Sequence, residues 1–148
     1  MKKFLRIFSL IVLVSGIYLI YGLVNSKPPS PTVTIENQHV TTAPASYCWN
    51  GLLTAECVDT ISPPEIIKHH DLKPVVVTAE AKLKVEFKNE PLKNTLSANK
   101  WISHNESETV NIDDHVLTAP KEKGIYVYDL FARWEKGDAS YAFVIEVK

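Results

Sequence analysis

The sequence predicts an all-β fold, an antiparallel β-sandwich preceded by one N-terminal transmembrane helix. Three observations support this prediction. An uncharged run of 18 residues, Ile7–Val24, follows Lys2, Lys3 and Arg6, and its length is close to what a helix needs to cross a bilayer. The remainder is rich in Val, Thr, Ile, Tyr and Trp, which favour strands. Turn signals recur there about every ten residues, as in sandwiches.

The first 26 residues have two interpretations, a retained membrane anchor and a cleaved secretory signal. The uncharged run is longer than the apolar core of about 7–15 residues that is typical of a signal, which favours the anchor. Cleavage after Ser26 stays open, because Val24-Asn25-Ser26 is a usable cleavage site. The positive charges before the run predict a cytoplasmic N-terminus and a single-pass topology, with the rest of the chain extracytoplasmic.

The segment beyond residue 26 divides into a stalk and one domain. Residues 27–31, KPPSP, predict a stiff and extended stalk, since proline lacks the amide donor of helices and sheets. Residues 32–148 are long enough for one domain with a modest core. Three of the 16 basic residues precede the apolar run and all 17 acidic residues follow it, so the exported part has a formal charge of −4. This charge argues against nucleic acid as a partner.

Cys48 and Cys57 are the only two cysteines, and in an exported chain they predict a disulfide. The bridge would close a small loop, 48–57, between two short paired strands, with a tight turn at Asn50-Gly51. The alternatives are a redox pair and a metal site. A redox pair would favour Cys-x-x-Cys, and a metal site would need further ligands at useful spacing.

The domain is expected to be built of short strands, with one helical turn over 65–70 after Pro63-Pro64. The residues of 82–88 alternate strictly, so Leu83, Val85 and Phe87 should face inward. A weaker strand over 93–101 would place Trp101 in the core. The other expected strands are 32–35, 39–42, 75–77, 108–112 and 115–118, the last two flanking a turn at Asp113-Asp114.

The last two strands show the clearest alternation. A turn over 135–138 separates them. On the first, one face is predicted to hold Tyr126, Tyr128, Leu130, Ala132 and Trp134. On the second, one face is predicted to hold Tyr141, Phe143, Ile145 and Val147.

The segment Glu122–Tyr128, EKGIYVY, resembles the E–F corner of immunoglobulin-like domains. The resemblance implies an immunoglobulin-like sandwich in which the hydroxyl of Tyr126 bonds back to upstream backbone. Tyr128 stands where antibody domains have their second cysteine. A cross-sheet disulfide of the antibody type is therefore not expected.

A wider pattern resembles small exported or membrane-anchored proteins of uncharacterised function from Gram-positive, Bacillus-type bacteria. It consists of Ser46-Tyr47-Cys48-Trp49, Cys57-Val58-Asp59 and the closing runs Gly124–Trp134 and Gly137–Val147. The resemblance implies no activity, since a shared fold does not establish a function.

Few residues are candidates for chemistry. His69-His70-Asp71 is the densest cluster of metal-ligand types, but adjacent histidines point apart on a helix or a strand. Asp113-Asp114 could hold calcium, although turn chemistry explains this pair more simply. The chain has no nucleophile-elbow motif and no phosphate-binding glycine loop. We therefore expect no enzymatic activity, no cofactor, no metal and no small-molecule substrate.

Trp49, beside Cys48, is the one candidate for partner binding. Its ring is either exposed on a protruding loop, as aromatic residues at binding surfaces are, or packed over the small disulfide. The sequence as a whole predicts a membrane-tethered extracytoplasmic binding or structural module that contacts an unknown envelope protein or the cell wall. The alternative is an exported inhibitor or regulator of a protease or signalling receptor, with the disulfide loop as its inserting element.

Overall fold

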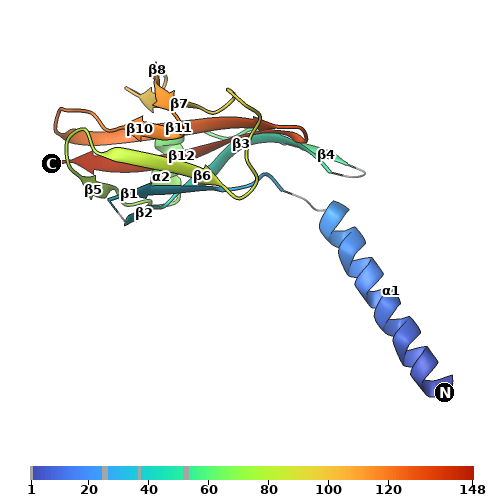
Figure 1. Cartoon of the computed structure of the whole chain (residues 1–148). Helices are drawn as coiled ribbons and strands as arrows, with labels where there is room; N and C mark the ends of the chain where they lie inside the picture. Colours follow the sequence, from blue (N-terminus) through green and yellow to red (C-terminus); the bar gives the residue numbers. More distant parts are fainter. Residues whose placement is uncertain (1, 25–26, 37, 52–53) are drawn as a thin grey trace.

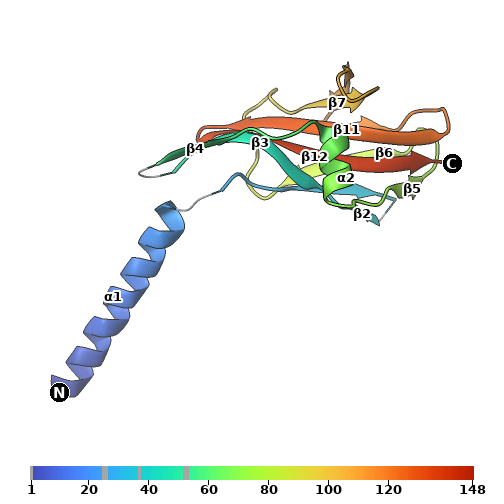
Figure 2. The same ribbon diagram turned by 180° about the vertical axis from the view of Figure 1, so that it is seen from behind.

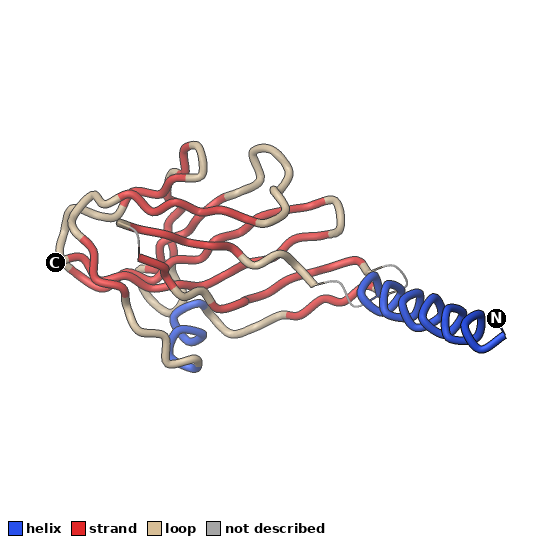
Figure 3. The backbone as a smooth tube through the Cα atoms, turned by 60° about the horizontal axis from the view of Figure 1, so that its bottom comes forward, coloured by secondary structure: helices blue, strands red, loops and turns tan. Residues whose placement is uncertain are grey.

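The computed structural model describes residues 2–24, 27–36, 38–51 and 54–148. Strands dominate the described chain, and the remaining elements are the helices α1 and α2 (Figure 3). Two sheets pack face to face and every strand pair is antiparallel except β5 with β12. The predicted antiparallel β-sandwich is thus confirmed.

The smaller sheet has the strand order β2-β1-β6-β10-β9 (Figure 1). Its strands are β1 (Pro31–Ile35), β2 (Gln38–Val40), β6 (Lys82–Phe87), β9 (Ile112–Asp113) and β10 (Val116–Thr118). The larger sheet has the order β4-β3-β12-β11-β7-β8, and β5 also pairs with β12. Its strands are β3 (Ala43–Asn50), β4 (Ala55–Val58), β5 (Val75–Val77), β7 (Ser97–Trp101), β8 (Ser107–Val110), β11 (Gly124–Trp134) and β12 (Gly137–Val147).

The core lies between the inner faces of the two sheets. The predicted inward residues of β6, β11 and β12 meet there, and only Tyr126, at the end of the core, is half-buried. Two aromatic pairs are part of this core. The rings of Tyr128 and Phe143 stack at 5.1 Å, and those of Phe87 and Trp134 meet edge to face at 5.1 Å. The alternation predicted for these three strands is confirmed.

Helix α2 (Pro63–His69) lies on the outer face of the larger sheet, across β3 and β12 (Figure 2). Two prolines start the helix, as predicted, because a missing amide proton costs nothing in the first turn. Ile66 packs on Ala43, Ala45 and Ala142. These small side chains allow a close approach, so β12 is covered on both faces.

Helix α1 (Lys2–Val24) extends away from one end of the sandwich (Figure 1). Within the described part of the chain, no helix combines the length and the apolar character that spanning a membrane requires. The structure therefore does not support the transmembrane helix predicted for residues 1–26.

Several boundaries differ from the prediction. The stalk ends at Ser30, because β1 begins at Pro31, and proline is tolerated as the first residue of a strand. β7 begins only at Ser97. Trp101 is half-buried outside the core cluster, since the pairing of β7 with β11 turns Ala98 inward instead.

The segment predicted as one strand over 108–112 is split between the sheets. β8 belongs to the larger sheet and β9 to the smaller one. The tight hairpin that follows is confirmed, but its turn is shifted by one residue. Asp114 and His115 both have positive φ, 45° and 63°, the conformation of a two-residue type I′ turn.

Candidate interaction surface

The outer face of the larger sheet is only partly covered by α2. Tyr128 and Leu130 of β11 point into the core. Because side chains alternate along a strand, the odd-numbered residues Ile125, Val127 and Asp129 lie on the opposite, outer face. We call the surface formed by Val76, Trp101, Ile125, Val127 and Asp129 the open face.

Strand pairing places the members of the open face side by side. Val127 lies opposite Trp101 on β7. Ile125 lies opposite Glu146 on β12, and Glu146 lies opposite Val76 on β5. Ile125 is 66% exposed and Val76 is 45% exposed. A contiguous apolar patch that remains in water on a sheet face is a candidate surface for binding another molecule.

Asp129 is the unusual member of the open face. It lies opposite Ala142 on one side and Asn99 on the other. Burial raises the pKa of Asp129 to about 6, and a hydrogen bond with the Asn99 side chain partly opposes this shift. The Thr109 hydroxyl donates to Asn99 Oδ1 at 3.1 Å, which continues the polar row onto β8. A carboxyl group in this state is poorly solvated.

Two polar atoms of the open face lack a partner among the described residues. They are Asp129 Oδ1, an acceptor, and Trp101 Nε1, a donor, and both are buried. An unsatisfied buried polar atom costs about 1–3 kcal/mol. The open face therefore combines exposed apolar area with two buried polar atoms that the described residues leave unsatisfied. The residues opposite Asp129 in the two flanking strand pairs, Ala142 and Asn99, carry no ionisable side chain.

Trp49 does not have the surroundings that either interpretation of the sequence expected. Its ring is only 7% exposed and belongs to the core, where it meets Trp134 edge to face at 5.7 Å. Cys48 and Cys57 are exposed. Cys48 and Trp49 are consecutive in β3, so their side chains point to opposite faces of the sheet. The indole therefore neither protrudes from a loop nor covers the disulfide.

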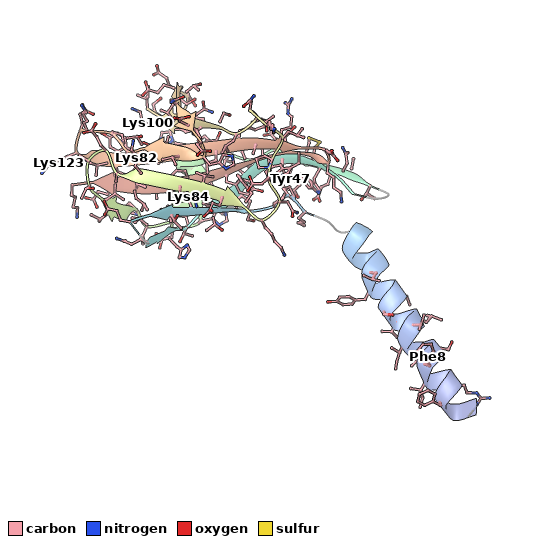
Figure 4. All side chains as sticks on the ribbon, in the orientation of Figure 1. Phe8, Tyr47, Lys82, Lys84, Lys100 and Lys123 are labelled. Atoms are coloured by element: carbon pink, nitrogen blue, oxygen red, sulfur yellow. A yellow bond between two sulfur atoms is a disulfide. The ribbon has the colours of Figure 1, made fainter. Side chains whose placement is uncertain are left out.

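The predicted disulfide between Cys48 and Cys57 is confirmed. The two residues are direct partners in the antiparallel pair β3–β4. The tight turn predicted at Asn50-Gly51 is wrong, because Asn50 still pairs with Ala55 as the last residue of β3. The loop begins after it, where the Gly51 amide donates to the Thr54 carbonyl at 2.7 Å, and residues 52–53 lie outside the described chain. The neighbouring Tyr47 (Figure 4) has a raised pKa, chiefly through desolvation and the nearby Glu56, and Lys27 lowers it.

The candidate metal ligands are not brought together. His69 and His70 are exposed at the C-terminal end of α2, with their rings edge to face at 5.2 Å. Asp113 and Asp114 are exposed at the β9–β10 turn. Over the described residues, no three His, Cys, Asp or Glu side chains lie close enough to hold a metal ion.

A comparison of the chain with protein-family models, curated proteins and solved structures finds no match. The candidate surface therefore depends on geometry alone. The residues of the open face were not singled out by the sequence. The one available signal was Asp129, a lone acidic residue within the apolar run Ile125–Phe131 of a predicted strand.

Proposed function

We propose that this protein is a non-enzymatic binding module that acts outside the cytoplasm and contacts another protein of the cell envelope through the open face. The observation that supports this most directly is the uncovered half of the larger sheet. There, Ile125 and Val76 are exposed, and Trp101 on the neighbouring β7 is half-buried. A partner that covered this half would remove the apolar area of Ile125 and Val76 from water.

Export is supported by the disulfide, because such bonds persist in oxidising compartments. The membrane tether is a proposal from the sequence alone, from three positive charges ahead of the uncharged run Ile7–Val24. In this proposal α1 is a retained anchor with a cytoplasmic N-terminus. A mature protein that begins at Lys27 and is free in the medium would instead make residues 1–26 a cleaved signal.

An immunoglobulin-like relationship is part of the proposal. The Tyr126 hydroxyl donates to the Glu122 carbonyl at 2.9 Å, as a tyrosine corner requires. The absence of a cross-sheet disulfide departs from antibody domains.

The alternative is an exported inhibitor or regulator whose β3–β4 hairpin inserts into a protease or receptor. The hairpin reaches beyond the rest of the sandwich (Figure 1), and its disulfide would stiffen it. However, Trp49 is buried and supplies no anchoring side chain at the tip. The broad sheet face therefore supports the binding module better.

Site-specific photo-cross-linking in intact cells tests this proposal. A photoreactive residue is placed at position 125 or 76, at position 56 on the hairpin, or at Glu86, an exposed position on β6 of the other sheet. We expect one discrete cross-linked product from positions 125 and 76, and its loss when Val127→Asp is added. A product from position 56 alone would favour the inhibitor. Equal labelling from Glu86 would reject a specific open face.

A further inference from the structure

A cavity lies at the end of the sandwich where the stalk enters. It has a volume of about 350 Å³, at the lower end of the range for small-molecule sites. Residues of the loop 89–92 line one side, and the other lining residues include Lys27, Pro29, Trp49, Trp134, Glu135 and Lys136. The open face lies on the outer side of the larger sheet, so the two sites share no residue.

The walls of this cavity are fixed by hydrogen bonds. The Tyr141 hydroxyl donates to the Pro29 carbonyl at 2.9 Å, which attaches the stalk to the sandwich. Burial raises the pKa of Tyr141 to about 12, so this donor keeps its proton at neutral pH. Trp134 Nε1 donates to the Asn89 carbonyl at 2.8 Å, which fixes the loop. The cavity is therefore formed before any ligand arrives.

The β11–β12 turn forms the third wall. The Asn50 amide donates to the Lys136 carbonyl at 2.7 Å, joining the turn to β3. Gly137 follows the turn, and a Cβ atom there would overlap the carbonyl of Cys48. Only glycine allows β3 and the turn to approach this closely. The backbone that carries Glu135 and Lys136 is thereby fixed at the rim of the cavity.

The polar groups around the cavity carry both signs of charge. Lys27 and Lys136 are cationic, and Glu90 and Glu135 are anionic. Within the described chain, no ion pair joins these lysines to these glutamates, and Glu90 has only a 3.8 Å contact with His115. Both signs are therefore available to a ligand, whereas a ligand of a single sign would meet as many like charges as opposite ones.

Trp49 lines the cavity with its ring and is otherwise buried in the core. Its Nε1 atom is buried and has no acceptor among the described residues, in contrast to Nε1 of Trp134. A buried N–H group without a partner costs about 1–3 kcal/mol. Because this atom is inaccessible to water, Trp49 contributes ring carbons and not its N–H group to the cavity wall.

We propose that this cavity binds a small zwitterionic ligand, an amino acid or a short peptide with a free ammonium and a free carboxylate. The carboxylate pairs with Lys136 and the ammonium pairs with Glu135, while Lys27 and Glu90 supply the second charge of each sign. The apolar part of the ligand packs on Pro29, Leu92 and the indole rings that line the cavity. Binding is reversible and involves no covalent step.

The indole N–H signals of the ¹⁵N-labelled full chain in detergent solution provide the test. The three tryptophans give three signals, assigned with Trp→Phe variants. The probe is the dipeptide Ala-Ala, and its N-acetylated, C-amidated form is the uncharged control. We expect a saturable shift of the Trp49 and Trp134 signals with Ala-Ala and at least tenfold weaker binding of the blocked form. The Trp101 signal should not move.

Paired variants test the charges. We expect Lys136→Gln and Glu135→Gln each to weaken Ala-Ala binding about tenfold, the effect of losing one charge-assisted hydrogen bond. Lys84 (Figure 4) and Glu86 form an exposed ion pair on β6 of the other sheet, and Lys84→Gln and Glu86→Gln should leave binding unchanged. Equal affinity for the blocked dipeptide, a comparable shift with glucose, or no shift at millimolar Ala-Ala would each overturn the proposal. None of these outcomes bears on the cross-linking at the open face.

Discussion

The two faces of the larger sheet are built on the same strands but differ in what covers them. The inner face of β11 and β12 is closed by the smaller sheet, and Tyr128, Leu130, Phe143 and Ile145 are all but inaccessible to water. The outer face is covered by α2 over Ala142 and left open at Ile125. Alternation along a strand shows which residues share a face. Whether that face is covered depends on other segments of the chain.

The largest expected effect is on the inner face. Phe143→Ala should lower the free energy of unfolding by about 3–5 kcal/mol, because the ring is fully buried and stacks on Tyr128. Such a loss approaches the whole stability of a small domain. Urea denaturation of the full chain measures it. A loss below about 1 kcal/mol would mean that the core does not lie between the two sheets.

The open face should respond to pH through Asp129. The pKa of its carboxyl is raised from 3.8 to about 6 by burial, so the folded state binds the proton more tightly than the unfolded state. This contribution to stability is complete below about pH 4 and is lost as the pH rises through 6. Asp129→Asn should therefore stabilise the protein at pH 7.5, by up to about 3 kcal/mol.

Thermal melts between pH 4 and pH 7.5 check this prediction, with Asp113→Asn on the exposed β9 as the matched control. The control should follow the wild-type profile. If Asp129→Asn also kept the wild-type pH profile, Asp129 would be as well solvated as an ordinary surface carboxylate.

The disulfide, at the exposed side of the β3–β4 hairpin, should matter less than the core. Cys48→Ser combined with Cys57→Ser should cost about 2–3 kcal/mol, because the loop that the bond closes is short. The wild-type chain measured with and without a reducing agent gives an independent value. A cost above that of Phe143→Ala would show that the hairpin is part of the main core.

Tyr126 lies at the end of the inner face, where the core meets solvent. Tyr126→Phe should cost about 0.5–1.5 kcal/mol, because it removes one partly exposed hydrogen bond to the Glu122 carbonyl. Denaturant melts measure the change. A silent substitution would remove the main support for a tyrosine corner.

The smallest effect is expected in the open half of the outer face. Ile125→Ala should change the free energy of unfolding by less than about 0.5 kcal/mol, since its side chain is already 66% exposed. The same substitution should reduce partner capture in the cross-linking experiment. A large loss of stability would mean that Ile125 is covered within its own chain.

Local patterns in the sequence were sufficient for several elements. The strict alternation of 82–88 predicted β6, and the two prolines before Glu65 predicted the start of α2. Trp101 was assigned to the wrong side because a weak alternation cannot establish register. Its orientation follows from pairing with Val127, a residue 26 positions later in the chain.

By itself, the sequence determined the antiparallel strands, the β3–β4 hairpin with its disulfide and the inward aromatic face of β11 and β12. These features depend on side-chain period and short loops, which are local properties. Only the tertiary structure decided that α2 covers half of the outer face and that Trp49 lines a cavity with the stalk. The physical reason is that burial and cavities arise where segments distant in the chain come into contact, and no local period encodes which segments those are.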